Sequence, residues 1–286
     1  MQVLVEYSNR EHIQQDNNAN GIIVALKDYS VESIEYYTLD EIREIASHKK
    51  GLLFVKMNKN FMNEEIDSLK EVLIELDSLE IDGIFFYDLA VLEIKRECNL
   101  KTELIWNQTH MVNNYKTCNY YYSKGVKYAL LGKEITLEEI LEIQKNSNIS
   151  CMVEVISKPS VAFSKRKLLT NYYQDNGEEK TDSLIVKEKV TNNNYCLIEN
   201  KDGTTFFLDI ITNGTSVIHD LYEGGIPYII MREFGIEECF MELVSDTMKY
   251  IKDKCRDTSY IDKYKKLGDS TNFFFRKTIY KVKKNG

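Results

Sequence analysis

The order of apolar runs along the chain constrains the fold more than any other feature. Eight short runs with strand character recur through the 286 residues, and most of the segments between them have a helical period. Several runs are almost continuously apolar, which is typical of strands buried on both faces. The eight runs cover residues 3–7, 21–27, 51–58, 82–88, 102–108, 127–132, 150–156 and 227–233.

The segments between the runs carry helix signals. Thr38 with Glu41 and Thr136 with Glu139 match the S/T-x-x-E pattern of a capping box. Further helices are predicted over residues 88–98, 110–124 and 236–255. Between residues 63 and 80, apolar side chains recur at spacings of three or four, at Ile66, Leu69, Leu73, Leu76 and Leu79.

A strand followed by a helix, repeated about eight times, predicts parallel strands joined by helical crossovers. Eight such strands close most economically into a TIM-type (β/α)8 barrel, and the chain length is near the ~250 residues typical of that fold. An open doubly wound α/β sheet is the alternative. We expect residues 1–286 to form a single barrel-like domain.

The seventh repeat departs from this pattern. About seventy residues separate the run at 150–156 from the last run, and they contain two segments with β character, at 182–190 and 195–210. The second segment includes the turn sequence KDGT. We therefore expect an inserted signature loop and a small β-rich excursion over residues 157–226, placed over the barrel mouth.

Composition and charge exclude several classes of protein. The chain has 37 basic and 45 acidic residues, a net charge of −8, which argues against non-specific coating of nucleic acid but allows a local basic site. Its six cysteines form no CxxC spacing, so we expect no metal site and no cofactor. No run of ~18 apolar residues and no signal-peptide pattern is present, so we expect a cytoplasmic protein without a membrane segment.

Polar residues gather at the expected C-terminal ends of the strands, where the chemistry of a barrel takes place. Glu154 is the most informative, because it lies inside the apolar run MVEVI, where a carboxylate is costly unless paired or open to water. Lys165 or Arg166 are its expected partners. The other strand-end residues are Glu6, Lys27, Lys56, Asn58, Asp88, Asn107, Gln108, Thr109, Lys133, Glu134, Arg232 and Glu233.

Motifs for nucleophilic catalysis or nucleotide binding are absent from the sequence. Ser164 lacks a G-x-S-x-G setting, and no P-loop or G-x-G-x-x-G occurs. The four histidines have no triad or metal spacing. The sequence AFSKRKLLTNYY (162–173) instead places three cations, Lys165, Arg166 and Lys167, before an apolar anchor. A solvated basic turn is the simplest interpretation, and an anion site is the alternative.

Four segments resemble peptidase family U32, the collagenase-like peptidases, and the resemblance runs through nearly the whole chain. GVKYALLGKEITLEEILEI (125–143) is similar to the family's G-hydrophobic-L-x-R-E-L-T/S-x-E-E-I segment. The following 152–173 resembles an acidic strand and then S-[KR]-R-x-L-L-[ST]-N-Y. IDGIFFYDLAVLEIKRE (81–97) and NFFFRKTIYKVKK (272–284) resemble two further family units.

The chain departs from the family at the cysteine motif. Many members have H-G-x-x-C-x-x-x-S-G-x-C there, and the cysteines bind an iron–sulfur cluster in branches that hydroxylate tRNA, rRNA or ubiquinone precursors. The resemblance puts Ile156 and Ser157 at the His-Gly, and Ser160 and Lys167 at the first two cysteines, with Cys196 alone downstream. This chain therefore resembles a short, cysteine-poor branch without the cluster.

The resemblance implies two functions. The first is a collagenase-like peptidase, which no legible nucleophile or acid pair supports. The second is a non-cluster-binding partner subunit in tRNA or rRNA hydroxylation, with a longer cysteine-bearing family member as its partner. The substrate would be a peptide or an RNA. A plain structural scaffold is a third interpretation, and it leaves Glu154 and Arg166 unexplained.

The resemblance also implies that 164–173 is a signature loop over the barrel mouth. In this interpretation Leu168, Leu169 and Tyr172 anchor the loop, and Arg166 is aimed at an anionic group near Glu154 and Glu134. The complete candidate pocket is Asp88, Gln108, Thr109, Lys133, Glu134, Glu154, Ser164, Lys165, Arg166, Asn171, Tyr172 and Arg232, with no catalytic residue assigned.

Overall fold

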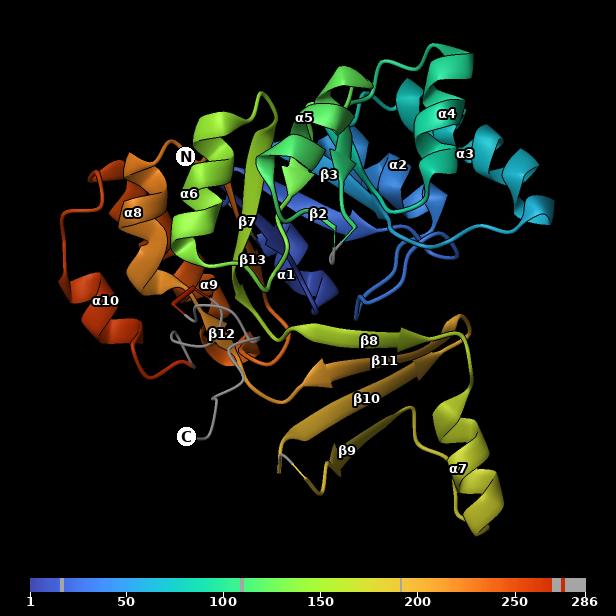
Figure 1. The fold of residues 1–286 in the computed structure, drawn as a ribbon. Coiled ribbons are helices and arrows are strands. Elements are labelled where there is room, and N and C mark those ends of the chain that lie inside the picture. The colour runs from blue at the N-terminus through green and yellow to red at the C-terminus, as the bar shows by residue number, and fades with distance from the viewer. Residues whose placement is uncertain (16–17, 109–110, 191, 269–273, 276–286) are drawn as a thin grey trace, which may run out of the picture.

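Eight parallel strands close into a barrel in the computed structural model, which describes residues 1–15, 18–108, 111–190, 192–268 and 274–275 (Figure 1). Neighbouring strands pair in chain order up to β7, and β13 then pairs with both β7 and β1. This confirms the predicted barrel over an open sheet. The strands are β1 (Gln2–Glu6), β2 (Gly21–Ala25), β3 (Leu52–Met57), β4 (Gly83–Phe86), β5 (Leu104–Trp106), β6 (Tyr128–Leu130), β7 (Ser150–Ser157) and β13 (Tyr228–Arg232).

Helices lie between the strands on the outside of the barrel (Figure 1). Thr38 and Thr136 form the expected capping boxes with Glu41 and Glu139. The helix predicted from residue 110 begins at Tyr115, and residues 109–110 lie outside the described residues. The helices are α1 (Arg10–Gln15), α2 (Leu39–His48), α3 (Ile66–Ser78, after the 3-10 turn η1, Asn63–Glu65), α4 (Leu89–Cys98), α5 (Tyr115–Ser123), α6 (Leu137–Asn146), α8 (Ile218–Glu223, after η2, Thr215–Val217), α9 (Glu237–Lys252) and α10 (Ser259–Tyr264).

The barrel interior contains an apolar layer with one side chain from every strand. Because successive strand residues face opposite sides, the residues between these positions face outward and pack against the helices. The residue two positions further along each strand faces inward again, at the C-terminal mouth. The apolar layer is Leu4, Ile23, Phe54, Phe85, Ile105, Leu130, Met152 and Ile230.

The small β-rich insertion before the last strand is also confirmed. A four-stranded antiparallel sheet, in the order β8-β11-β10-β9, lies beside the barrel mouth with α7 at its far end (Figure 1). Leu169 and Tyr173 of α7 pack with Leu197 to form a separate small core. The insertion consists of β8 (Ser160–Ser164), α7 (Leu168–Asn176), β9 (Ser183–Lys187), β10 (Asn194–Asn200), β11 (Gly203–Leu208) and β12 (Thr212–Asn213), the last paired with β7.

Only part of the C-terminal segment that resembles the family is described. Of residues 272–284, the structure describes 274 and 275, where the Phe274 carbonyl accepts from the amide of Leu137 and so ties this segment to α6. The remainder lies outside the described residues. Within the described chain, every helix is too short or too polar to cross a membrane.

Candidate functional site

A polar layer lies directly above the apolar layer of the barrel. Each of its members stands two residues after an apolar-layer residue on the same strand or at its end, so the alternation of the strands turns it inward. A cavity of about 660 Å³ opens above this layer, and four of the six residues of the layer line the cavity. The layer consists of Glu6, Lys56, Tyr87, Asn107, Glu154 and Arg232, of which Lys56, Tyr87, Asn107 and Arg232 line the cavity.

Arg232 on β13 connects the two buried carboxylates of the layer. Its Nε lies 2.6 Å from Oε2 of Glu154 on β7, and its Nη1 lies 2.9 Å from Oε2 of Glu6 on β1. Lys133, from the loop after β6, places its Nζ 3.0 Å from Oε1 of Glu154. Glu154 is thus held between two cations.

Lys56 on β3 completes the network on the other side of Glu6. Its ammonium lies 3.2 Å from Oε1 of Glu6, and it donates to Ser33 Oγ at 2.7 Å and to the carbonyl of Glu32 at 3.0 Å. The Ser33 hydroxyl in turn donates to Glu6 at 2.7 Å. The loop after β2 therefore fixes the lysine against the barrel wall.

The pKa values follow from burial opposed by paired charge. Burial disfavours the ionised carboxylate of Glu154, but Arg232 and Lys133 outweigh it and hold its pKa at about 2. Burial acts the same way on Glu6, where Arg232 and Lys56 bring the pKa below its usual value. Burial lowers the pKa of Lys56 to about 8, against the attraction of Glu6. Both carboxylates are therefore ionised at neutral pH.

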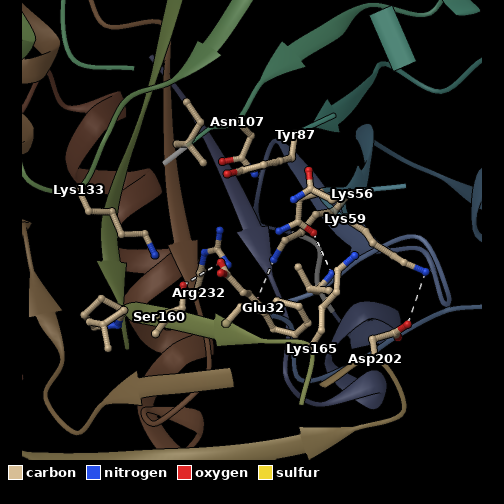
Figure 2. Close-up of a pocket in the computed structure, with 18 of the residues that line it drawn as sticks. Glu32, Lys56, Lys59, Tyr87, Asn107, Lys133, Ser160, Lys165, Asp202 and Arg232 are labelled. Carbon is tan, nitrogen blue, oxygen red and sulfur yellow. Dashed lines mark hydrogen bonds and ion pairs between the residues drawn. The ribbon is translucent and has the colours of Figure 1, made fainter. Parts of the chain in front are cut away.

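The insertion closes one side of the cavity through contacts with barrel loops. Ser160 on β8 donates its hydroxyl to Oε2 of Glu32 at 3.0 Å. Asp202, in the β10–β11 turn, lies 3.6 Å from Lys59, which follows β3. Figure 2 shows Lys133, Arg232, Glu32 and Ser160 on one side of the cavity and Lys59, Lys165 and Asp202 on the other. The cavity thus lies between the barrel and the insertion.

The structure brings five of the proposed pocket residues together. Lys133, Glu134, Lys165 and Arg232 line the cavity, and Glu154 lies beneath it, paired with Lys133 and Arg232. The expected partners of Glu154 were Lys165 or Arg166. Lys133 and Arg232 take this place because they lie on or directly after the strands that flank β7.

Two other proposed residues have structural contacts. Asp88 caps α4, where one oxygen accepts from the amide of Ala90 and the other from the amide of Phe61. Gln108 accepts from the indole of Trp106 and donates to the carbonyl of Tyr87. Thr109 lies outside the described residues.

The remaining proposed residues lie on the insertion and do not line the cavity. Ser164 accepts from the amide of Arg166, and the Arg166 side chain is exposed. Asn171 and Tyr172 are exposed on α7. The tyrosine that anchors the helix is Tyr173, because it lies on the same side of α7 as Leu169, and this side packs against the small core.

The pocket proposed from the sequence omits several residues that the structure places at the cavity. Glu6, Lys56 and Asn107 were noted as strand-end residues but not included in the pocket, and Glu32 and Ser160 were not considered part of it. For the strand residues a signal exists in the sequence. Each stands two positions after an apolar residue of the same strand, and residues two apart on a strand face the same side. For Glu32 and Ser160 no comparable signal exists, because a loop and a long insertion bring them together.

A family model decides the relationship of the chain to known proteins. The model described as "Peptidase family U32" matches residues 12–245. The chain belongs to peptidase family U32. The resemblance seen in the sequence is thereby confirmed over residues 12–245, a range that contains every residue of the polar layer except Glu6 on β1.

Among its relatives is a protein of nearly the same extent. The chain is 24% identical over 289 residues to tRNA hydroxylation protein P2 of Bacillus subtilis, and the alignment covers 92% of this chain and 93% of that protein. It is 23% identical over 158 residues to tRNA hydroxylation protein P1 of the same organism, covering 54% of this chain and 37% of P1. A solved structure, thiamine phosphate pyrophosphorylase from Pyrococcus furiosus, aligns with a TM-score of 0.46 at 12% identity, covering 88% of this chain and 96% of that one.

The residues that the sequence resemblance matches to the family's cysteines do not fit an iron–sulfur cluster. Ser160 donates to Glu32, and Lys167 donates its ammonium to the carbonyl of Asn200. Cys196 is buried in the small sheet, where burial raises the pKa of its thiol. Within the part of the chain that the structure describes, no group of three or more His, Cys, Asp or Glu side chains is arranged to hold a metal ion.

Proposed function

We propose that this U32 protein is a subunit of a tRNA hydroxylation system that works without an iron–sulfur cluster of its own. The observation that carries the proposal is the similarity to tRNA hydroxylation protein P2 over more than nine-tenths of both chains. The similarity to P1 supports a second, longer family member as the partner. In this role the cavity binds an anionic group.

The charges at the cavity support an anionic ligand. Glu6 and Glu154 are each paired with two cations, and the described residues that line the cavity include six Lys or Arg and five Asp or Glu. A carboxylate or phosphate entering the cavity meets Lys133 and Arg232, which both line it. Arginine suits such a site because its planar fork stays charged when buried.

The same geometry gives little support to peptide hydrolysis. Among the described residues that line the cavity there is no cysteine and no histidine. Ser160 is the one serine there, and its hydroxyl donates to Glu32 without a histidine between them. A serine nucleophile normally needs an adjacent base that accepts its proton and later returns it to the leaving group.

Deleting the gene in its own organism tests the proposal. Digested tRNA from the deletion strain is compared with wild type by mass spectrometry of the nucleosides. We expect a nucleoside carrying one additional oxygen atom to disappear and to return when the intact gene is supplied. The Lys133→Gln variant should not restore it, because the cavity loses a cation while Glu154 keeps Arg232 as its partner.

Two further measurements separate the alternatives. Lys187→Gln, an equal change of charge on the far strand β9, should restore the nucleoside fully. Co-purification of the tagged chain with a longer family member supports the subunit role. Unchanged tRNA in the deletion strain, together with hydrolysis of casein or gelatin that Ser160→Ala abolishes, would establish a peptidase instead.

A further inference from the structure

The turn between β8 and α7 has a backbone that is fixed from several sides. Ser164 Oγ accepts from the amide of Arg166 at 3.2 Å, and Thr204 Oγ1 donates to the carbonyl of Arg166 at 2.9 Å. The amide of Leu168 donates to the same carbonyl at 3.0 Å. Gly203 packs so closely beneath the turn that a Cβ there would lie 2.1 Å from the carbonyl oxygen of Ser164. The turn is therefore a rigid support for its side chains.

The side chains of Lys165 and Arg166 differ from the other cations near the cavity. Both are exposed, and within the described chain neither side chain has a hydrogen bond or ion pair. Lys165 acts electrostatically on Glu65, but the carboxylate of Glu65 is already paired with Lys59 at 2.7 Å. By contrast, an acidic side chain or a carbonyl pairs with each of the cations Lys56, Lys59, Lys133, Lys167, Lys201 and Arg232.

The amides at the start of α7 already have an acceptor within the protein. The buried carboxylate of Glu199 already accepts from the amides of Leu169 at 2.8 Å and Thr170 at 3.2 Å. An internal anion thus occupies the position where the helix end would attract one. At the turn between β8 and α7, the groups that remain to bind an external anion are the side chains of Lys165 and Arg166.

An exposed aromatic ring follows on the same helix. Tyr172 is 48% exposed, and its ring makes an edge contact with the ring of Tyr173 at 5.3 Å between centroids. Tyr173 is buried, and its hydroxyl lies 2.7 Å from the hydroxyl of Thr181. The Tyr172 ring is braced from inside and open to solvent on the outside. Proteins commonly bind single-stranded nucleic acid with cations that contact its phosphate backbone and with aromatic rings on which its bases stack.

We infer that Lys165, Arg166 and Tyr172, here called the β8–α7 corner, bind a single-stranded segment of RNA. The two cations contact successive phosphates, and the ring stacks on an unpaired base. Lys165 also lines the cavity, so the strand runs from the corner to the mouth, where the next nucleotide can enter. This inference rests on the proposed function, which supplies tRNA as the substrate.

The chemistry of the corner favours an unpaired strand over duplex RNA. A tyrosine ring stacks only on a base that is not already stacked within a helix. A cavity can admit a nucleotide only after it has left its pair. An unpaired tRNA loop meets both conditions.

Binding of a labelled single-stranded RNA of about 12 nucleotides to the full chain, over a series of salt concentrations, tests the inference. Changing both Lys165→Gln and Arg166→Gln should weaken binding roughly tenfold at low salt. It should also reduce the slope of log affinity against log salt by about 1.4, or about 0.7 for each cation. Tyr172→Ala should weaken binding at least about fivefold and leave the slope unchanged, and Tyr172→Phe should restore it.

Matched variants control for general effects. Lys187→Gln removes the same charge from β9, and Tyr122→Ala removes an equally exposed ring from α5, so both should bind RNA like the wild type. All the changed side chains are exposed, so equal thermal unfolding curves confirm that the variants fold. A duplex RNA of the same length should bind more weakly than the single strand.

An unchanged salt slope in the double variant, or equal affinity for duplex and single strand, would overturn the inference. If RNA binding is unaffected while co-purification of a family partner is lost, the corner contacts an acidic protein surface instead. The binding assay needs no hydroxylation, so the two proposals fail separately. RNA bound through the corner by a chain whose deletion leaves tRNA unchanged would contradict the proposed function alone.

Discussion

Arg232 Nε lies 2.6 Å from Oε2 of Glu154, and the same guanidinium reaches Glu6 on the opposite neighbouring strand. These contacts are short ion pairs between side chains with little exposure to solvent. The attraction between charges at short range in a buried setting therefore holds this layer together. Removing one charge leaves the others buried without compensation.

The first prediction concerns Arg232. Arg232→Met should lower the free energy of unfolding by about 3–5 kcal/mol, because the ionised carboxylates of Glu6 and Glu154 lose the partner they share. Unfolding in urea, followed by far-UV circular dichroism, measures the change. The double variant with Glu154→Gln should recover part of the loss, since one of the two uncompensated charges is then removed.

A matched surface change provides the control. Arg96 pairs with Glu93 on the exposed face of α4, so Arg96→Met should leave the unfolding curve within experimental error. Equal losses for Arg96→Met and Arg232→Met would mean that the buried network contributes nothing specific.

A second prediction is a loss of stability in acid that depends on Glu154. Its pKa of about 2 in the folded protein lies below the ordinary value of 4.5, because Arg232 and Lys133 outweigh the effect of burial. Between these values the unfolded chain binds the proton more tightly, so stability falls as the pH drops from 4.5 towards 2. Urea unfolding at several pH values should show this slope, reduced in Glu154→Gln. Identical slopes would refute the shift.

Lys56 gives a third prediction, with its window in alkali. Burial places its pKa at about 8, below the ordinary 10.5. Between these values the unfolded chain holds the proton that the folded chain has lost, so this group makes stability rise with pH. Lys56→Met should flatten that rise in urea unfolding. A slope that persists in the variant would assign it to another group.

The barrel could be predicted from the sequence because its signals are local and repeated. Each buried strand is an apolar run, and capping boxes such as Thr38 with Glu41 mark helix starts. The insertion could be predicted because the connection between the last two barrel strands, about seventy residues, is much longer than the other connections. Strand β8 and helix α7 were missed because residues 160–176 pack on their own small sheet, and short segments stabilised by distant partners carry weak local signals.

The candidate site could be predicted only in part. Glu154 stood out because a carboxylate inside an apolar run demands a partner, but the partner is set by strand order. Arg232 is far away in sequence and adjacent in space only because β13 inserts between β7 and β1. Arg166 is close to Glu154 in the chain and was therefore an expected partner, yet its side chain is exposed and does not line the cavity.

A fourth prediction concerns iron. The purified chain, even when prepared without oxygen, should contain no stoichiometric iron or acid-labile sulfide, because the sequence resemblance matches Ser160 and Lys167 to two of the family's cysteines. Metal analysis and a visible absorption spectrum measure this, with a cysteine-bearing family member prepared in parallel as the positive control. About four irons per chain would contradict it.

The last prediction concerns the anchor of α7. Glu199 is buried and accepts from the amides of Leu169 and Thr170 at the start of the helix, and from the hydroxyl of Thr170. Glu199→Ala should leave those donors unpaired, so amide hydrogens of residues 168–176 should exchange at least about tenfold faster. The barrel helices should exchange as before, because α7 packs on a separate core. Glu178→Ala, an exposed acid just after the helix, is the control and should change neither region. If protection of α7 survives in Glu199→Ala, the small core alone holds the helix in place.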